Sequence, residues 1–316
     1  MARLPLVSPL DRALFLKAQP YFEGLTPNLL ALLASHSDEM FFPAGARVRR
    51  AGNPIDTVHF FGSGTLAIEH MIDGRTARFE VTAPGAVGLA DHFAQTLAPP
   101  GVRATIDTSC LTLATADLDQ ILEDHFSLVH QFARATCDSV VATCKALADM
   151  RSDERGFEAS DLVDTPATLD LVQRLARARR APLLRGTNLT ILAELIRFDE
   201  PEQIATGEAL WREGDPIDRM VLILDGRFRT EGQFGVARAG AGATLGAWEI
   251  VATGPRFEGW VAEVSSRILS IEKELFVDLL EDHFEFAQTY LRRLSVQVAD
   301  GVRARARQTI EREHRR

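Results

Sequence analysis

The chain has 316 residues, of which 46% are hydrophobic and 25% charged, and its formal net charge is -9 at pH 7. This length predicts two domains, and the acidic balance argues against a nucleic-acid-binding protein, which normally carries a basic surplus. Three cysteines are too few for a disulfide framework, and no apolar run approaches the roughly 18 residues needed to span a bilayer. We therefore expect a soluble, cytoplasmic protein that does not enter a membrane.

Short helices and then short strands are predicted along the first part of the chain. Ser8-Pro9 and Thr26-Pro27 each place a capping hydroxyl before a proline, which favours the first turn of a helix. Apolar runs punctuated by glycine and proline then predict the strands of a jelly roll or barrel. These runs are Thr57–Phe61, Thr65–Glu69 and Thr76–Val81, followed in the second half by Met220–Leu224 and Arg227–Thr230.

A long amphipathic helix is predicted after each strand-rich region. Apolar residues recur every three or four positions from Ala116 to Leu147 and again from Phe276 to Val302. His125 and His283 fall on these helices, where we expect packing or a surface hydrogen bond rather than metal binding. Between the halves, residues 151–170 are polar and acidic without a clear period, and they are predicted to form a linker.

Two blocks of sequence occur twice and in the same order. The first copy of the longer block is FPAGARVRRAGNPIDTVHFFGSGTL, starting at Phe42, and the second is IATGEALWREGDPIDRMVLILDGRF, starting at Ile204, an offset of 162. The pentapeptide LEDHF recurs at an offset of 158. Because such matched blocks indicate a duplication, we predict one domain at 1–150 and a second at 171–316.

The motifs GNPIDTVHFFGSG (52–64) and GDPIDRMVLILDG (214–226) carry a family resemblance. With the preceding pairs Ala44-Gly45 and Thr206-Gly207, they resemble the cyclic-nucleotide-binding domain, a family that includes catabolite-activator-type regulators and kinase regulatory subunits. The resemblance implies an α+β fold that is mainly β. It would consist of two tandem jelly-roll β-barrels, each flanked by helices and followed by a long helix.

In this family a short cassette between two strands holds the cyclic nucleotide. Backbone N–H groups of a small helix and an arginine bind the phosphate, and a glutamate after a glycine binds the ribose. The segment LGAWEIVATGPR of the second copy resembles this cassette, with Arg256 as the implied phosphate ligand. The implied binding residues are Gly246, Ala247, Trp248, Pro255 and Arg256, with Glu249 and Trp260 as further candidate contacts.

The first copy departs further from the family pattern. Gly88 falls on the family glycine, and Leu89, followed by Ala90, stands where the ribose glutamate would be. Alignment through LEDHF puts Ala98 at the arginine position, and Arg103 is predicted to lie in the following strand. We therefore expect a degenerate cassette in the first domain and a partly retained one in the second, where Ala247 replaces the ribose glutamate.

Three hypotheses for the function follow. The leading one is a non-enzymatic regulatory protein that signals through protein partners or a homodimer formed by the long helices, with cAMP or cGMP as a ligand of the second domain. The alternative is a ligand-independent scaffold with two degenerate pockets. A DNA-binding regulator is less favoured, because few residues follow the second long helix and a helix-turn-helix would need more.

Other signals have structural interpretations. No nucleophile–base pair, phosphate loop or metal-binding motif indicates an enzyme, a cofactor or a metal site. The Arg-rich residues 301–316 are predicted to be the solvated end of a helix, with an interaction arm for an anionic partner as the alternative.

Overall fold

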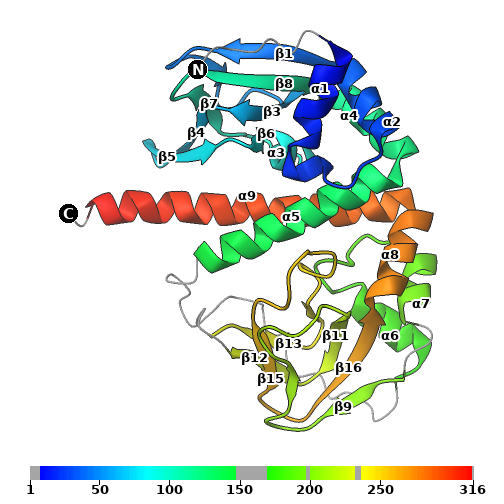
Figure 1. The fold of residues 1–316 in the computed structure, drawn as a ribbon. Helices are drawn as coiled ribbons and strands as arrows, with labels where there is room; N and C mark the ends of the chain where they lie inside the picture. Colours follow the sequence, from blue (N-terminus) through cyan, green and yellow to red (C-terminus); the bar gives the residue numbers. More distant parts are fainter. Residues whose placement is uncertain (1–7, 147–168, 197–199, 232–235, 315–316) are drawn as a thin grey trace. The chain divides into compact units, whose positions relative to one another are not determined.

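The computed structural model describes residues 8–146, 169–196, 200–231 and 236–314 (Figure 1). The contacts divide the chain into two compact units. One comprises Met1–Thr136 with Leu294–Arg316, and the other comprises Cys137–Arg293. These limits are not the predicted 150 and 171, because two long helices, α5 (Phe126–Ala146) and α9 (Phe284–His314), each contribute residues to both units. Most of the predicted linker, 151–168, lies outside the described residues, while Asp170 already caps the next helix, α6 (Leu171–Ala178).

The first unit begins with the two predicted helices. Ser8 caps α1 (Pro9–Lys17) through a capping box, since its hydroxyl accepts a hydrogen bond from the Asp11 backbone N–H at 3.1 Å. Thr26 caps α2 (Pro27–Ser35) through its hydroxyl alone, which accepts from the Leu29 backbone N–H at 3.4 Å. A single 3-10 turn, η1 (Pro20–Phe22), joins the two helices. Both predicted helix starts are confirmed.

Strands β1 to β8 then form the first barrel from two antiparallel sheets, with strand orders β1-β8-β3-β6 and β2-β7-β4-β5. The strands are β1 (Ser37–Phe42), β2 (Arg47–Arg49), β3 (Thr57–Ser63), β4 (Thr65–Ile72), β5 (Arg75–Thr82), β6 (Gly85–Val87), β7 (Gly101–Ala104) and β8 (Thr108–Ala114). A short helix, α3 (Leu89–Phe93), lies between β6 and β7. Alternate residues of the facing strands, such as Phe61, Leu66 and Val102, fill the space between the sheets.

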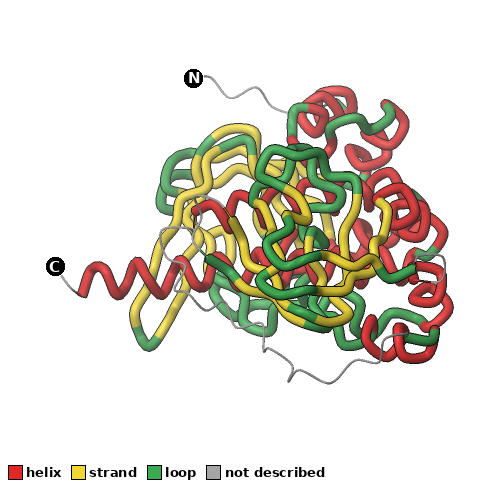
Figure 2. The backbone as a smooth tube through the Cα atoms, turned by 90° about the horizontal axis from the view of Figure 1, so that it is seen from below, coloured by secondary structure: helices red, strands yellow, loops and turns green. Residues whose placement is uncertain are grey.

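The second unit repeats this plan strand for strand. Helices α6 (Leu171–Ala178) and α7 (Leu189–Ile196) precede sheets with the orders β9-β16-β11-β14 and β10-β15-β12-β13. The strands are β9 (Glu202–Ile204), β10 (Ala209–Trp211), β11 (Arg219–Asp225), β12 (Arg227–Glu231), β13 (Arg238–Gly240), β14 (Thr244–Leu245), β15 (Gly259–Ala262) and β16 (Ser266–Glu272). Figure 2 shows the helices in red and the strands in yellow along the tube. The predicted tandem jelly rolls and the α+β class are confirmed.

One glycine recurs in both copies because the backbone at that position requires it. Gly64 and Gly226 have φ angles of +101° and +93°, a conformation that favours glycine. A Cβ added to Gly64 would lie 2.2 Å from the Thr108 hydroxyl, and one added to Gly226 would lie 2.0 Å from the Ser266 hydroxyl. The same tight crossing of two strands is therefore built into both barrels.

The helix predicted after each barrel is broken at the LEDHF histidine. The first barrel is followed by α4 (Thr115–Asp124) and α5 (Phe126–Ala146), and the second by α8 (Lys273–Asp282) and α9 (Phe284–His314). His125 and His283 lie between them with φ and ψ near -137° and 84°, and -131° and 87°. The prediction of one uninterrupted helix after each barrel was therefore wrong. No helix among the described residues is long and apolar enough to cross a membrane.

Candidate functional site

The cassette of the second barrel starts at Gly246, directly after β14. Its φ of +76° turns the chain into a short helical turn, in which the Glu249 backbone N–H donates to the Gly246 carbonyl at 3.2 Å. A Cβ on Gly246 would lie 2.6 Å from the Arg256 Nη1 and 3.2 Å from the Trp211 Cη2. Glycine is therefore required here because the arginine side chain lies against its Cα.

Arg256 ends the cassette and is 1% exposed. Its Nη1 donates to the Glu249 Oε1 at 3.0 Å, and its Nη2 lies 3.4 Å from the Asp218 Oδ1 and donates to the Arg219 carbonyl oxygen. The guanidinium carbon lies 3.9 Å from the centre of the Trp211 ring, a cation–π contact. The predicted phosphate ligand is thus fixed within the barrel by an internal carboxylate, a carbonyl and an aromatic ring.

Glu249 is the internal anion of this site. It is 3% exposed, and its second carboxylate oxygen accepts from the Phe257 backbone N–H at 3.5 Å. Burial raises the pKa of Glu249, and the attraction of the Arg256 guanidinium offsets this effect only in part. The carboxylate lies on the guanidinium that the resemblance assigns to a ligand phosphate, so an anionic ligand would compete with it.

Two buried donors in the same place have no protein acceptor among the described residues. They are the Arg256 Nε–H and the Trp211 indole N–H. An unsatisfied buried donor costs about 1–3 kcal/mol, so an acceptor at this position would be stabilising. They are therefore two groups of this site whose hydrogen bonds an acceptor would complete.

Two helices hold the cassette by hydrogen bonds within the second unit. On α9, the Tyr290 hydroxyl donates to the Ala247 carbonyl at 3.1 Å and lies 3.3 Å from the Cys137 sulfur on α5. Next to Cys137, the Asp138 carboxylate accepts from the Thr253 backbone N–H at 3.1 Å and from its hydroxyl. A movement of the cassette would therefore strain or break hydrogen bonds to both helices.

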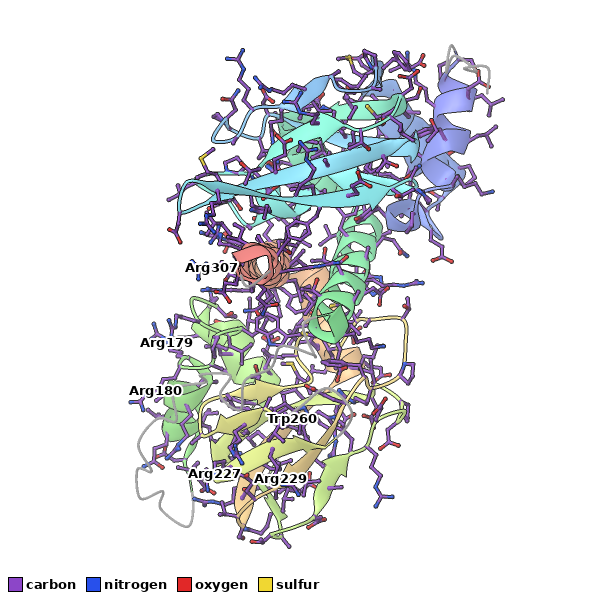
Figure 3. All side chains as sticks on the ribbon, turned by 90° about the vertical axis from the view of Figure 1, so that its left-hand side faces the viewer. Arg179, Arg180, Arg227, Arg229, Trp260 and Arg307 are labelled. Carbon is purple, nitrogen blue, oxygen red and sulfur yellow. The ribbon has the colours of Figure 1, made fainter. Side chains whose placement is uncertain are left out.

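The remaining predicted residues of the second cassette take different places. Ala247 is fully buried, so no side chain reaches a ribose from the position of the family glutamate. Trp248 is half-buried, and Pro255 is exposed. Trp260 lies on β15 in the hydrophobic core of the barrel and is only 7% exposed, which leaves little of its ring for stacking on a base (Figure 3).

The first cassette contains the short helix α3. This helix begins directly after Gly88, whose φ is +95°. Leu89 is buried, Ala90 is half-buried and Ala98 is exposed. The Gly52 backbone N–H donates to the Pro99 carbonyl, as the equivalent Gly214 N–H donates to the Arg256 carbonyl, both at 2.9 Å. By this hydrogen bond Pro99 corresponds to Arg256, whereas the offset of 158 places Ala98 there, and neither residue has a charge.

A guanidinium nevertheless occupies the first cassette, and alignment of the cassettes missed it. Arg49 of β2 pairs with Asp91 of α3 at 3.1 Å and donates to the Pro100 carbonyl from two nitrogens. Its Nη1 lies 3.4 Å from the position of a Cβ on Gly88. Arg103 is on β7, where it contacts Glu69 and the Gly45 carbonyl instead.

The two barrels therefore hold equivalent ion pairs from different positions. Asp91 and Glu249 each follow the cassette glycine by three residues. The repeat offset of 162 places Arg49 on Trp211, the ring on which the Arg256 guanidinium stacks. The sequence contained a signal for these ion pairs, because both copies have an acidic residue three positions after the cassette glycine.

The Arg-rich C-terminal part of α9 belongs to the first unit. The Arg305 guanidinium lies 5.5 Å from the centre of the Phe79 ring on β5, and Ala306 is fully buried. Arg303 and Arg307 are exposed. This segment is thus packed on one side and exposed on the other, which differs from the fully solvated helix end predicted. No group of histidine, cysteine, aspartate or glutamate residues in the described ranges could hold a metal ion.

Comparison with known proteins gives a family for the second barrel. The family model described as cyclic nucleotide-binding domain matches residues 201–283, which run from the start of the second barrel to the end of α8. A search of curated proteins found no match.

Solved structures show a general likeness. The regulatory domain of Toxoplasma gondii PKA with cAMP is 14% identical, with 90% of this chain and 95% of that one covered and a TM-score of 0.34. The regulatory subunit of a cAMP-independent protein kinase A from Trypanosoma brucei is 14% identical, with 89% and 90% covered and a TM-score of 0.33. The N-terminal domain of a transcriptional regulator from Streptomyces coelicolor is 23% identical, with 40% and 93% covered and a TM-score of 0.36.

The family match of the second barrel and the strand order repeated in both barrels agree with the resemblance seen in the sequence motifs. Residues 201–283 match the cyclic nucleotide-binding domain family, and the first barrel repeats the strand order of the second.

Proposed function

We propose that this chain is a non-enzymatic regulatory protein that acts through protein partners, and that its second barrel is the ligand site. The ligand class is a cyclic nucleotide such as cAMP or cGMP. The observation that carries the proposal is a pair of buried donors beside the cassette, on Arg256 and Trp211, for which the described residues provide no acceptor. A phosphate oxygen is a strong acceptor for such donors.

The ligand binds in competition with Glu249 and without a glutamate for its ribose. A charged hydrogen bond contributes about 1.5–3 kcal/mol, so its absence weakens binding about 10- to 150-fold compared with a complete site. The hydrogen bonds from the Tyr290 hydroxyl to the Ala247 carbonyl and from the Thr253 N–H to Asp138 then supply the route by which occupancy shifts α9 and α5. This is a population shift between helix arrangements, and it requires different affinities for the ligand in each.

Thermal unfolding followed by tryptophan emission tests the proposal. All three tryptophans, Trp211, Trp248 and Trp260, lie in the second barrel, so their emission reports this barrel alone. A cyclic nucleotide at 100 times its Kd adds about 2.7 kcal/mol of stability, which raises Tm by roughly 5–10 °C for a unit of this size. cAMP, cGMP and a cyclic dinucleotide are compared as ligands.

Matched variants distinguish specific binding. Arg256→Lys keeps a positive charge but loses the guanidinium fork, and it should abolish most of the shift. Arg212→Lys changes an exposed arginine of the same barrel and should leave the shift unchanged. If no cyclic nucleotide shifts the wild-type Tm at millimolar concentration, the proposal of a ligand site is wrong.

A ligand-independent scaffold is the second candidate, and one observation favours it. In each barrel the cassette guanidinium is already paired with an internal carboxylate, Glu249 or Asp91, and the ribose position holds a buried apolar residue, Ala247 or Leu89. Such a protein would keep its partner binding unchanged by cyclic nucleotides. The thermal-shift panel separates the two candidates.

A further inference from the structure

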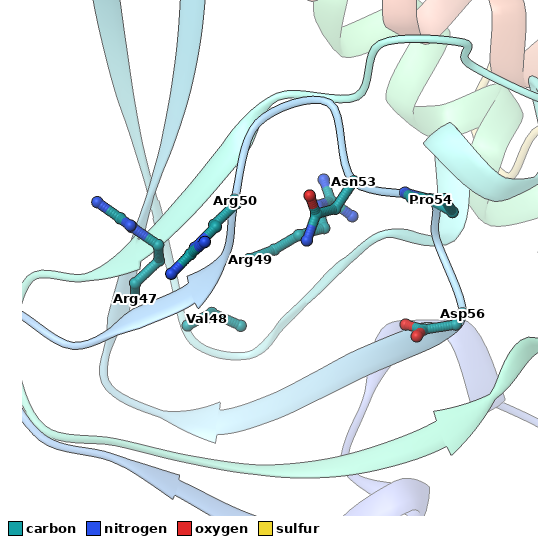
Figure 4. Close-up of a pocket in the computed structure, with 7 residues that line it drawn as sticks. All are labelled: Arg47, Val48, Arg49, Arg50, Asn53, Pro54 and Asp56. Carbon is teal, nitrogen blue, oxygen red and sulfur yellow. The ribbon is translucent and has the colours of Figure 1, made fainter.

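A pocket of about 480 Å³ lies on the first barrel, at β2 and the loop that leads to β3 (Figure 4). Its lining residues are Arg47, Val48, Arg49, Arg50, Asn53, Pro54 and Asp56. This volume is within the range of about 300–1,000 Å³ that is usual for small-molecule sites. The lining is mostly polar and contains three guanidinium groups, so its chemistry is that of an anion site.

Two of these arginines are available to a ligand. Arg49 is paired with Asp91 and half-buried, so its charge is balanced. Arg47 and Arg50 are exposed, and neither side chain has an ion pair or hydrogen bond in the described part of the chain. Asp56 is the acidic group of the lining, and Figure 4 shows it at the far end of the pocket from both.

The second barrel shows that the fold does not need the positive charge of this pocket lining. Residues 47–56 contain three arginines and one aspartate, a net charge of +2, whereas residues 209–218 contain one arginine and three acids, a net charge of -2. Both segments make the same turn, since the Asn53 N–H donates to the Arg50 carbonyl and the Asp215 N–H to the Arg212 carbonyl, at 3.3 and 3.2 Å. In the second barrel, Asp215 also accepts from the Arg212 N–H.

The charge is also locally unfavourable. Arg47 pairs in register with Arg103 on β7, and like charges opposite each other destabilise a sheet. Glu69 balances Arg103 but not Arg47. The exposed arginines of this pocket cost stability, although the chain as a whole has a net charge of -9. A ligand that neutralises them would explain why they are present.

We propose that this pocket binds a small phosphate-bearing anion with at least two negative charges. Arg47 and Arg50 would bind the phosphate oxygens through their guanidinium forks, and the Asn53 amide would donate a further hydrogen bond. Arg49, whose charge Asp91 balances, completes the lining beside them. A pocket of this volume suits a diphosphate group or a nucleoside diphosphate. This proposal concerns the first barrel and does not depend on the cyclic-nucleotide site.

Calorimetric titration of the full chain with inorganic pyrophosphate at low ionic strength tests the site. The probe should bind the wild type, and Arg47→Gln/Arg50→Gln should weaken binding at least about 10-fold, the lower end for one charged hydrogen bond. Arg212→Gln, the equivalent of Arg50 in the second barrel, should bind as the wild type does.

Two further titrations identify the source of the phosphate. ADP binding tighter than pyrophosphate indicates a nucleotide, and equal affinity indicates recognition of the phosphates alone, and both support the proposal. The proposal is overturned if the wild type does not bind pyrophosphate, or if the double variant binds it equally well while its circular dichroism is unchanged. Binding of a single-stranded 12-mer oligonucleotide that pyrophosphate does not displace would also overturn it, in favour of a nucleic-acid surface.

Discussion

Replacement of Arg256 by methionine is the sharpest test of the ion pair in the second cassette. Methionine keeps most of the apolar contact with Trp211 but removes the hydrogen bonds to Glu249, Asp218 and the Arg219 carbonyl. It leaves Glu249, 3% exposed, without its counter-charge. Breaking a buried pair on one side costs about 3–5 kcal/mol, and we expect a loss of this size at pH 7.

The loss should depend on pH in a defined direction. Burial already raises the pKa of Glu249 above its ordinary value, and removal of Arg256 raises it further. A carboxyl whose folded-state pKa is raised contributes stability that is complete below the unfolded pKa and is lost as pH rises through the folded pKa. The variant should therefore be less destabilised at pH 5 than at pH 8, with a slope of up to about 1.4 kcal/mol per pH unit.

Urea unfolding followed by tryptophan emission measures this effect in the second barrel alone. Glu249→Gln/Arg256→Met replaces both charges, so we expect it to recover at least about 2 kcal/mol and to lose the pH dependence. Arg212→Met serves as the exposed control. A cost below about 1 kcal/mol for Arg256→Met, or no recovery in the double variant, would refute the claim that the two buried groups depend on each other.

Three other changes have predicted outcomes. Gly246→Ala should destabilise the second barrel more than Gly214→Ala, by at least about 1 kcal/mol in urea unfolding, because both have positive φ but only the first new Cβ meets the arginine. Asp138→Ala should cost about 1–2 kcal/mol in the same assay, since the Thr253 N–H loses its acceptor, while Asp138→Asn should cost less. Burial, then the charge of a neighbouring arginine, lowers the pKa of His59 from 6.5 to about 4, so the unfolded state alone takes up a proton below pH 6.5. Stability present above pH 6.5 should fall by roughly 2 kcal/mol between pH 6.5 and 5, measured by circular dichroism, and His59→Asn should remove this loss.

The duplication and the barrels could be predicted from the sequence because glycine has few substitutes at a positive φ. Gly64 and Gly226 recur in register since a Cβ at either would collide with the neighbouring strand. The breaks at His125 and His283 could not be predicted, because the apolar spacing continues across them and only the backbone dihedrals change. Periodicity reports which face is apolar and does not report a turn between two helices that share that face.

The candidate site was predicted in part. Gly246 and Arg256 were identified from the motif, but their partner Glu249 was considered only as a substitute ribose contact. Arg49 was missed because alignment compares residues at one position, whereas a guanidinium can reach the same place from another strand. The inward direction of the Trp260 ring likewise depends on tertiary packing.

Calorimetric titration of cAMP and cGMP into the wild type and Glu249→Gln tests the central claim most directly. If the second cassette is a ligand site in which Glu249 occupies the arginine, at least one nucleotide should bind, and Glu249→Gln should bind it about 10-fold more tightly. Absence of binding to both proteins at millimolar nucleotide would contradict the claim.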